Sequence, residues 1–198
     1  MTLHNQSYPK CAPDRIYGTT SDGSAVAIPV DDDTLALVCI NTTDLAVNEG
    51  RHFYKTEVVT LTGAGDTATF LFVTPSGTKH IHAWAKFDPT EGVDIKIYEG
   101  ATTSNDGTPV STLNSNRELQ STHPASLLMY ATPTISTTGD EIWHAVGGAG
   151  RSVGVMPAMS TRIIAKKDTK YYFLLTKTAS GTCDVSVEAS WEEHEPEG

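Results

Sequence analysis

Apolar and polar residues alternate with a period of two between residues 74 and 100. Two sets of apolar residues each fall on one face of a predicted strand: Ile81, Ala83, Ala85 and Phe87, then Val93, Ile95 and Ile97. Such alternation is typical of half-buried antiparallel strands, because successive side chains point to opposite faces of a sheet. The connection contains Pro89 and Gly92, which favour a short turn. We therefore expect a β-hairpin here, at the centre of a β-sandwich.

Strand patterns recur along the rest of the chain. They predict strands at residues 24–30, 34–40, 51–62, 67–73, 127–130, 141–146, 161–166, 171–177 and 182–192. The run TATFLFV at 67–73 is continuously apolar, as expected for a central strand buried on both faces. Residues 63–66 and Ser180-Gly181 each favour a hairpin turn between neighbouring strands. No segment longer than ten residues shows a helical period.

These patterns predict an all-β fold, an antiparallel β-sandwich of jelly-roll-like type over residues 24–192. Residues 1–23 contain two prolines, two glycines and no periodicity, which predicts an extended N-terminal arm. Residues 193–198 are expected to form a short acidic C-terminal tail. Residues 101–126 are rich in Thr, Ser and Asn, and a loop of that length commonly has a contact role.

Charge and cysteine usage narrow the classes of partner. The chain has 198 residues, and 24 acidic against 14 basic residues give a formal net charge of −10. An acidic chain gains little from a phosphate backbone, so we expect no nucleic-acid partner. No apolar run approaches the roughly 20 residues of a membrane helix, and the first residues lack the apolar core of a signal peptide. Three cysteines without metal-ligand spacing indicate buried thiols in a protein made in a reducing cytoplasm.

His80 and His82 are the candidate metal ligands, because two imidazoles at positions i and i+2 of a strand share one face. A cupin site in a jelly roll also needs a glutamate four or five positions beyond the second histidine. Lys86 and Phe87 stand there instead, and an ammonium group repels a cation. We therefore expect no metal and no cofactor. The alternative is that these histidines lie on the surface or in an interface, near Trp84.

Other candidate chemistry has ordinary explanations. The run Asp31–Asp33 predicts a solvated turn rather than a cation site, because no EF-hand-like spacing follows it. A carboxylate pair of the kind used by glycosidases could be drawn from Asp94, Glu99 and Asp106. That hypothesis would rest only on how common Asp and Glu are in the chain. No serine or cysteine nucleophile motif is present in the sequence. We expect a protein that is not an enzyme.

Several short motifs follow one another in order: Thr74-Pro75, Lys79 to His82, Tyr98-Glu99-Gly100, Gly107-Thr108-Pro109 and Asn114-Ser115-Asn116-Arg117. In this order they resemble a set of tailed-bacteriophage virion proteins, and the closing YYFLLTKTASG and VSVEASWEE resemble the C-terminal strands of that set. The resemblance covers roughly residues 50 to 192. It implies a virion structural protein made in the host bacterial cytoplasm. The implied type is a capsid decoration (cement) protein on the outer capsid surface, with the major capsid protein as its partner.

Within the long polar segment, Arg117 with Asn114 and Asn116 is the candidate partner-binding site. A guanidinium group presents a planar fork that can hold several carbonyl groups or a carboxylate at once. The alternative is that Arg117 orders the loop inside its own subunit. Closed symmetry at capsomer junctions predicts a homodimer or homotrimer. The alternative function is a phage tail or fibre adhesion module that binds host surface glycan through aromatic residues and Thr/Asn-rich loops.

Overall fold

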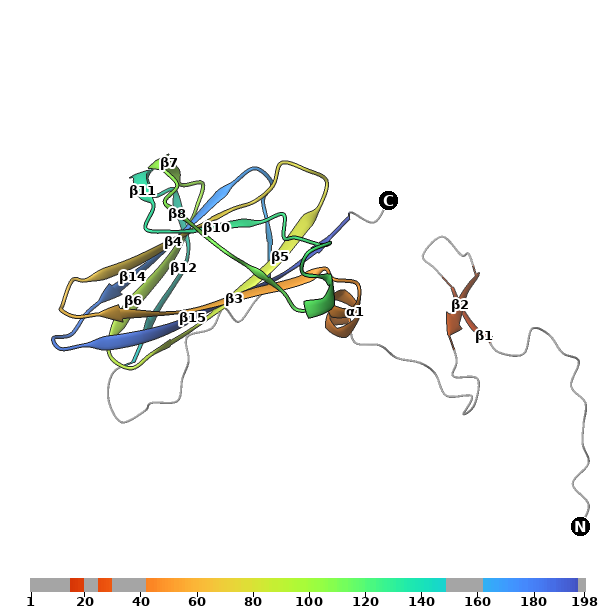
Figure 1. Ribbon diagram of the computed structural model, residues 1–198, viewed down its shortest axis with the longest axis horizontal. Coiled ribbons are helices and arrows are strands. Elements are labelled where there is room, and N and C mark those ends of the chain that lie inside the picture. The colour runs from red at the N-terminus through yellow and green to blue at the C-terminus, as the bar shows by residue number, and fades with distance from the viewer. Residues whose placement is uncertain (1–14, 20–24, 30–41, 149–161, 196–198) are drawn as a thin grey trace, which may run out of the picture. The chain divides into compact units, whose positions relative to one another are not determined.

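A computed structural model describes residues 15–19, 25–29, 42–148 and 162–195 (Figure 1). The chain divides into two units, Met1–Thr42 and Thr43–Gly198. In the first unit, β1 (Arg15–Thr19) and β2 (Ala25–Pro29) pair antiparallel as a sheet of their own. The strand expected at residues 24–30 therefore pairs in this separate sheet and not in the two sheets of the second unit, and the domain boundary expected at residue 24 stays a prediction. The strand expected at 34–40 and the Asp31–Asp33 turn lie outside the described residues.

The second unit is a sandwich of two antiparallel sheets. The five-stranded sheet has, in spatial order, β13 (Ile163–Ala165), β5 (His80–Pro89), β15 (Cys183–His194), β3 (His52–Leu61) and β9 (Leu113–Asn114). The six-stranded sheet has β12 (Asp140–Gly147), β6 (Val93–Glu99), β14 (Lys170–Lys177), β4 (Thr67–Val73), β10 (Leu128–Ala131) and β8 (Thr108–Val110). Consecutive strands alternate between the two sheets from β3 to β6 and again from β12 to β15, which is the jelly-roll arrangement. The predicted fold class is confirmed.

The predicted hairpins are wrong in their pairing, although their strands form as expected. β5 and β6 lie in different sheets, and so do β3 and β4, and β14 and β15. β5 pairs with β13 and β15, whereas β6 pairs with β12 and β14. The physical reason is that a short turn suits an arch between two sheets as well as a hairpin within one. In the arch, the two apolar strand faces pack against each other across the core.

The core lies between the sheets and uses the predicted apolar faces. Phe87, Ile95, Leu175 and Val185 have no exposed surface. The ring of Trp143 stacks on Phe87 with centroids 5.6 Å apart. β4 is buried on both faces at its centre, as its continuous apolar run predicts. Cys183 is a buried free thiol, whereas Cys11 and Cys39 lie outside the described residues.

The predicted long loop at 101–126 is instead an ordered insertion between β6 and β12. It contains β7 (Thr102–Asn105), β8, β9 and the 3-10 helix η1 (Arg117–Leu119), and it continues into β10 and β11 (Thr134–Thr137). β8 extends the six-stranded sheet beside β10, and β9 extends the five-stranded sheet beside β3. β7 pairs with β11, and these strands lie together at one side of the sandwich in Figure 1.

The insertion covers part of the outer face of the six-stranded sheet. Leu71, Ala101 and Tyr172 are buried in a second apolar cluster, and Ile135 of β11 packs against it. This burial explains why β4 and β14 carry apolar side chains on both faces. The outward residues of the six-stranded sheet are therefore partly covered by the chain itself.

The expected acidic tail begins later than predicted, because β15 continues to His194. Glu193 is buried, and its Oε1 accepts hydrogen bonds from the backbone N–H groups of Ser126 (2.7 Å) and Leu127 (3.1 Å) and from Trp191 Nε1 (3.2 Å). Three donors satisfy this buried carboxylate, which an isolated sequence of acidic residues does not reveal. One short helix, α1 (Thr42–Asn48), precedes the sandwich and was not predicted. Within the described residues, no helix has the length and apolar character needed to cross a membrane.

Candidate functional site

The outer face of the five-stranded sheet gathers unlike polar groups around one carboxylate. The strand register places Glu192 of β15 opposite His82 of β5 on one side and opposite His52 of β3 on the other. Arg162, directly before β13, donates a hydrogen bond from Nη1 to Glu192 Oε2 at 3.2 Å. The guanidinium carbon of Arg162 also lies 4.4 Å from the ring centroid of Trp84. We call this group the Glu192 cluster: His52, His82, Trp84, Arg162, Glu192 and His194.

Strand alternation brings the cluster to one face. His82 and Trp84 occupy successive outward positions of β5, since Ile81 and Ala85 point into the core. The His82 and His194 rings meet edge to face with centroids 4.3 Å apart, and the His52 and Trp84 rings lie 5.5 Å apart. These contacts join three neighbouring strands through their side chains, in addition to the backbone hydrogen bonds of the sheet.

Arg162 also connects the cluster to the beginning of the sandwich. Its Nη2 donates to the hydroxyl oxygen of Thr43, in α1, at 3.1 Å. One guanidinium group therefore contacts an indole face, a carboxylate and a hydroxyl. Its planar fork allows this combination, whereas the single ammonium group of a lysine would not.

The electrostatics of the cluster leave one carboxylate oxygen without a donor. Glu192 is only 7 % exposed, and its Oε1 has no hydrogen-bond partner among the described residues. Burial lowers the pKa of His52, and the Glu192 carboxylate opposes that shift. Burial also lowers the pKa of His82, with a further lowering from the charge of His194. The imidazoles of His52 and His82 are therefore neutral at pH 7, and Arg162 is the cation that balances Glu192.

The predicted candidate ligands His80 and His82 both lie on this outer face. Their rings approach His194, with centroid distances of 6.2 Å for His80 and 4.3 Å for His82. Within the part of the chain that the structure describes, no group of three or more His, Cys, Asp or Glu residues is arranged to hold a metal ion. The expectation that no metal binds here stays a prediction. Lys86, at the position where a cupin has its glutamate, lies 3.7 Å from Glu188 Oε1.

A serine–histidine pair on the same face is closed to substrates. Ser190 Oγ lies 3.3 Å from His52 Nε2, and His52 Nδ1 lies 2.5 Å from Ser115 Oγ. Nucleophilic catalysis needs an accessible hydroxyl and a group that orients the base, usually a carboxylate. Ser190 is buried, and the group at the far side of the ring is another hydroxyl. This chain of hydrogen bonds ties β15 and the segment after β9 to β3.

The predicted partner-binding residues Asn114, Asn116 and Arg117 come together, but they contact their own subunit. Asn114 is fully buried: its Nδ2 donates to the carbonyl groups of Gly50 (2.8 Å) and His123 (3.0 Å). Its Oδ1 accepts from the backbone N–H of Asn116 at 2.9 Å. Asn114 therefore supports the insertion from inside, and a direct partner contact at this residue stays a prediction.

Asn116 and Arg117 lie nearer the surface of the insertion. Asn116 Nδ2 donates to the carbonyl of Asn48 at 3.2 Å, which links the insertion to α1. Arg117 Nη1 donates to Gln120 Oε1 at 2.8 Å and to the carbonyl of Asn114 at 3.4 Å. These contacts are the loop-ordering role that the sequence leaves open for Arg117. A partner contact through Asn116 and Arg117 stays a prediction.

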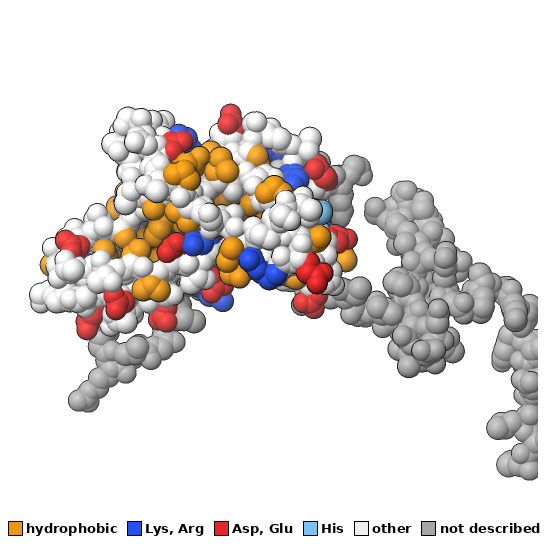
Figure 2. Space-filling model, viewed as in Figure 1, with side chains coloured by type: hydrophobic (Ala, Val, Ile, Leu, Met, Phe, Trp, Pro, Cys, Tyr) orange, Lys and Arg blue, Asp and Glu red, His pale blue; other side chains and the backbone are white. Residues whose placement is uncertain are grey.

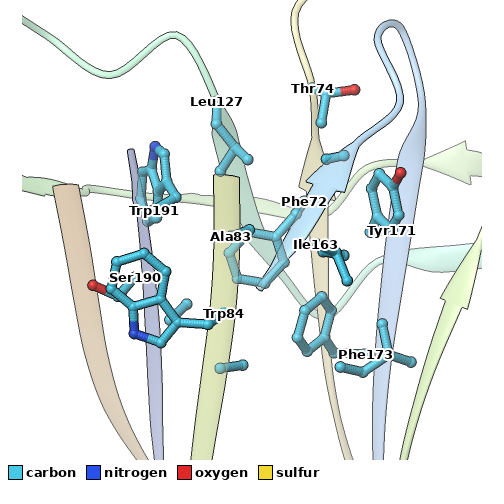
Figure 3. Close-up of a pocket in the computed structure, with 14 residues that line it drawn as sticks. Phe72, Thr74, Ala83, Trp84, Leu127, Ile163, Tyr171, Phe173, Ser190 and Trp191 are labelled. Atoms are coloured by element: carbon cyan, nitrogen blue, oxygen red, sulfur yellow. The ribbon is translucent and has the colours of Figure 1, made fainter. Parts of the chain in front are cut away.

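Two cavities lie near the candidate residues described above. One is an internal cavity of about 30 Å³ between the sheets, with the side chains of Phe72, Tyr171 and Trp191 around it (Figure 3). Its lining is almost wholly apolar, so it offers a water molecule too few polar partners and is a packing defect. The other, of about 390 Å³, lies at the end of β15, where Lys79 Nζ is 3.4 Å from Glu193 Oε2.

Sequence reasoning missed Arg162, Glu192 and His194 as members of one cluster. Glu192 is visible in the sequence as an outward residue of the last strand, but its neighbours depend on the sheet order, which alternation does not specify. Comparison of the chain with protein-family models gives no match, and comparison with curated proteins gives no significant match. The fold and the Glu192 cluster, together with the sequence motifs, therefore carry the functional proposal.

Proposed function

We propose that this chain is a structural virion protein of a tailed bacteriophage, which binds the outside of the capsid and stabilises the shell. The short motifs that follow one another between residues 74 and 117 support this proposal, because in this order they resemble virion proteins. The observation that carries it is the organisation of the chain: a jelly-roll sandwich joined to an N-terminal unit with its own β-hairpin. Two units on one chain provide two points of attachment to neighbouring shell subunits.

In such an arrangement, the stabilising free energies of the bound copies add up over the shell. Each copy that binds the assembled shell, and not its dissociated subunits, shifts the equilibrium toward the assembled form. The second attachment of a tethered pair takes place at a high effective concentration and strengthens the first. Many copies of moderate affinity then produce a large total stabilisation. In this role the protein is a binding component with the major capsid protein as partner, a homodimer or homotrimer, and needs neither catalysis nor a cofactor.

The proposal is tested with shells assembled from the major capsid protein alone. Purified protein is mixed with expanded shells, the shells are sedimented, and bound copies are counted. We expect saturable binding at micromolar concentration, hundreds of copies per particle, and a higher melting temperature of the shell. Absence of binding at micromolar concentration contradicts the proposal. Counted in whole virions instead, a handful of copies per particle points to the tail.

A tail or fibre adhesion module for host glycan is the second candidate function. The observation that favours it is the combination of Trp84, Arg162 and Glu192 on one sheet face, because an indole and charged hydrogen-bonding groups recognise sugar rings and hydroxyl groups. Labelling of whole virions separates the two functions: antibody on the head supports the decoration role, and antibody on the tail supports adhesion. A glycan array gives the independent check.

A further inference from the structure

The two outer faces of the sandwich differ in what covers them. The chain's own insertion covers part of the six-stranded sheet, where Leu71 and Tyr172 are buried beneath it. The five-stranded sheet instead carries the Glu192 cluster on its outer face, and Ile164 of β13 pairs with His82 beside it. Ile164 is 62 % exposed, and Val58 on the same face of β3 is 64 % exposed.

The composition of this face resembles the energetic centre of a protein interface. Tryptophan and arginine are enriched among the residues that contribute most to binding, and the contacts around them exclude water. Trp84 and Arg162 are such residues, and Ile164 is an exposed apolar side chain beside them. Contacts within the cluster already hold the Trp84 and Arg162 side chains in place, so binding costs less conformational entropy.

The charge of this face specifies the partner's chemistry. The outward positions of β5 and β15 carry four carboxylates: Asp88, Asp184, Glu188 and Glu192. The Lys and Arg side chains facing them are Lys86 and Arg162, so carboxylates outnumber these cations on the face. Acidic side chains also lie across the visible face of the molecule in Figure 2, in keeping with the net charge of −10. Such a face attracts a basic surface and repels an acidic one.

Glu192 adds an independent indication of a missing donor. Its side chain is more than nine-tenths buried, yet Oε1 has no hydrogen-bond partner among the described residues. Leaving a buried acceptor of a charged group unsatisfied is costly, and a donor from outside removes that cost. Arg162 has 43 % of its side chain exposed, so the side of the cluster next to Glu192 faces solvent.

We propose that the outer face of the five-stranded sheet docks onto a basic patch of the shell protein, and that a lysine or arginine of that patch completes the hydrogen bonding of Glu192. This inference rests on the proposed function. The cation approaches Glu192 from the outer face of the sheet, while Ile164 packs against the apolar surroundings of the patch. Docking in this orientation leaves Ala101 and Ile135, which pack on the outer face of the opposite sheet, facing away from the shell.

The test compares exposed residues on the two edge strands. Ile164→Asp changes the proposed surface, and Val146→Asp, at a residue 69 % exposed on the outward side of β12, is the matched control. Both positions are accessible, so both variants fold, which circular dichroism and thermal melting verify. Binding to shells of the major capsid protein is measured for each. We expect I164D to weaken binding at least tenfold and V146D to change it less than twofold.

A second variant tests the charge. Glu192→Gln keeps the shape of the side chain and removes its charge, so we expect at least tenfold weaker binding and a shallower dependence on salt concentration. Wild-type protein that does not bind shells refutes the proposed function, and this inference with it. Wild-type protein that binds shells while I164D and E192Q bind equally well refutes the docking surface alone. Equal weakening by V146D and I164D also refutes it.

Discussion

The side chain of Asn114 is expected to hold the insertion onto the sandwich. Replacing Asn114 with alanine removes three hydrogen bonds, to the carbonyl groups of Gly50 and His123 and from the backbone N–H of Asn116. A typical hydrogen bond contributes about 1 kcal/mol net, and a buried group that loses its partner costs about 1 to 3 kcal/mol. The change therefore lowers the free energy of unfolding by about 3 to 5 kcal/mol. That is a large part of the roughly 5 to 15 kcal/mol that stabilises a typical domain.

The matched control is Asn116→Ala. Asn116 also makes two side-chain hydrogen bonds, to the carbonyl of Asn48 and from the backbone N–H of Glu118, but both are exposed. Water replaces an exposed partner, so the expected loss is about 1 kcal/mol or less. Asn114→Asp adds a third comparison, because it keeps the shape of the side chain but removes the Nδ2 donors. We expect it to be at least as destabilising as alanine at neutral pH, since a carboxylate would then face two carbonyl groups.

Urea unfolding measures these differences. Circular dichroism follows the sheets and tryptophan fluorescence follows the core, and coincident transitions justify a two-state analysis. An N114A protein within 1 kcal/mol of the wild type contradicts the role given to Asn114. So does an N116A protein that is as destabilised as N114A, because the burial of the bonds would then be irrelevant.

Three further predictions concern backbone, core and pH. Gly139→Ala and Gly65→Ala both place a side chain at positive φ, +81° and +89°, but only at Gly139 would the new Cβ lie 2.2 Å from a backbone carbonyl oxygen. Thermal melting should show a loss of about 1 kcal/mol for G65A and clearly more for G139A; equal losses contradict the close approach. Lys177 is buried and its Nζ has no hydrogen-bond partner among the described residues, so Lys177→Met should raise the free energy of unfolding by about 1 to 3 kcal/mol, and a loss in urea unfolding contradicts this. The pKa values of His52 and His82 are lowered in the folded protein, so the unfolded chain binds protons at these residues at a higher pH than the folded chain does. Their contribution to the free energy of unfolding is therefore complete above about pH 6.5 and is lost as the pH falls below it. Replacing both histidines with glutamine should reduce the loss of stability below about pH 6.5, and an unchanged slope in urea titrations contradicts the assignment.

The strands could be predicted from the sequence because the burial of a side chain is a local property of its strand. The alternation around Phe87 and Ile95 identifies the faces that turn inward, and both residues are fully buried. Pairing is not local. The turn at Pro89 to Gly92 is compatible with a hairpin or with an arch, and only the packing of the two sheets selects the arch.

The candidate site shows the same division. The sequence places His82 and Trp84 outward on one strand, and the structure confirms that position. Arg162 and Glu192 are 30 residues apart and meet because β13 and β15 flank β5 in the sheet. The sequence predicts a C-terminal tail that begins at Glu193, since carboxylates are rarely buried. The two backbone N–H groups that donate hydrogen bonds to its buried carboxylate belong to Ser126 and Leu127, in the insertion, which is distant in the sequence.

The insertion between β6 and β12 has a consequence for how molecules can associate. It ends the two sheets on one side with β8 and β9, of three and two residues, and β13 on the other side has three. Among the described edge strands of the sandwich, β12 is the long one, with eight residues. A fibril that grows by pairing the edge strands of successive molecules needs two long, unpaired edge strands on each molecule. With one such edge strand, two molecules can pair through β12, and no second long edge remains to add a third molecule. Association by strand pairing would therefore stop at a dimer.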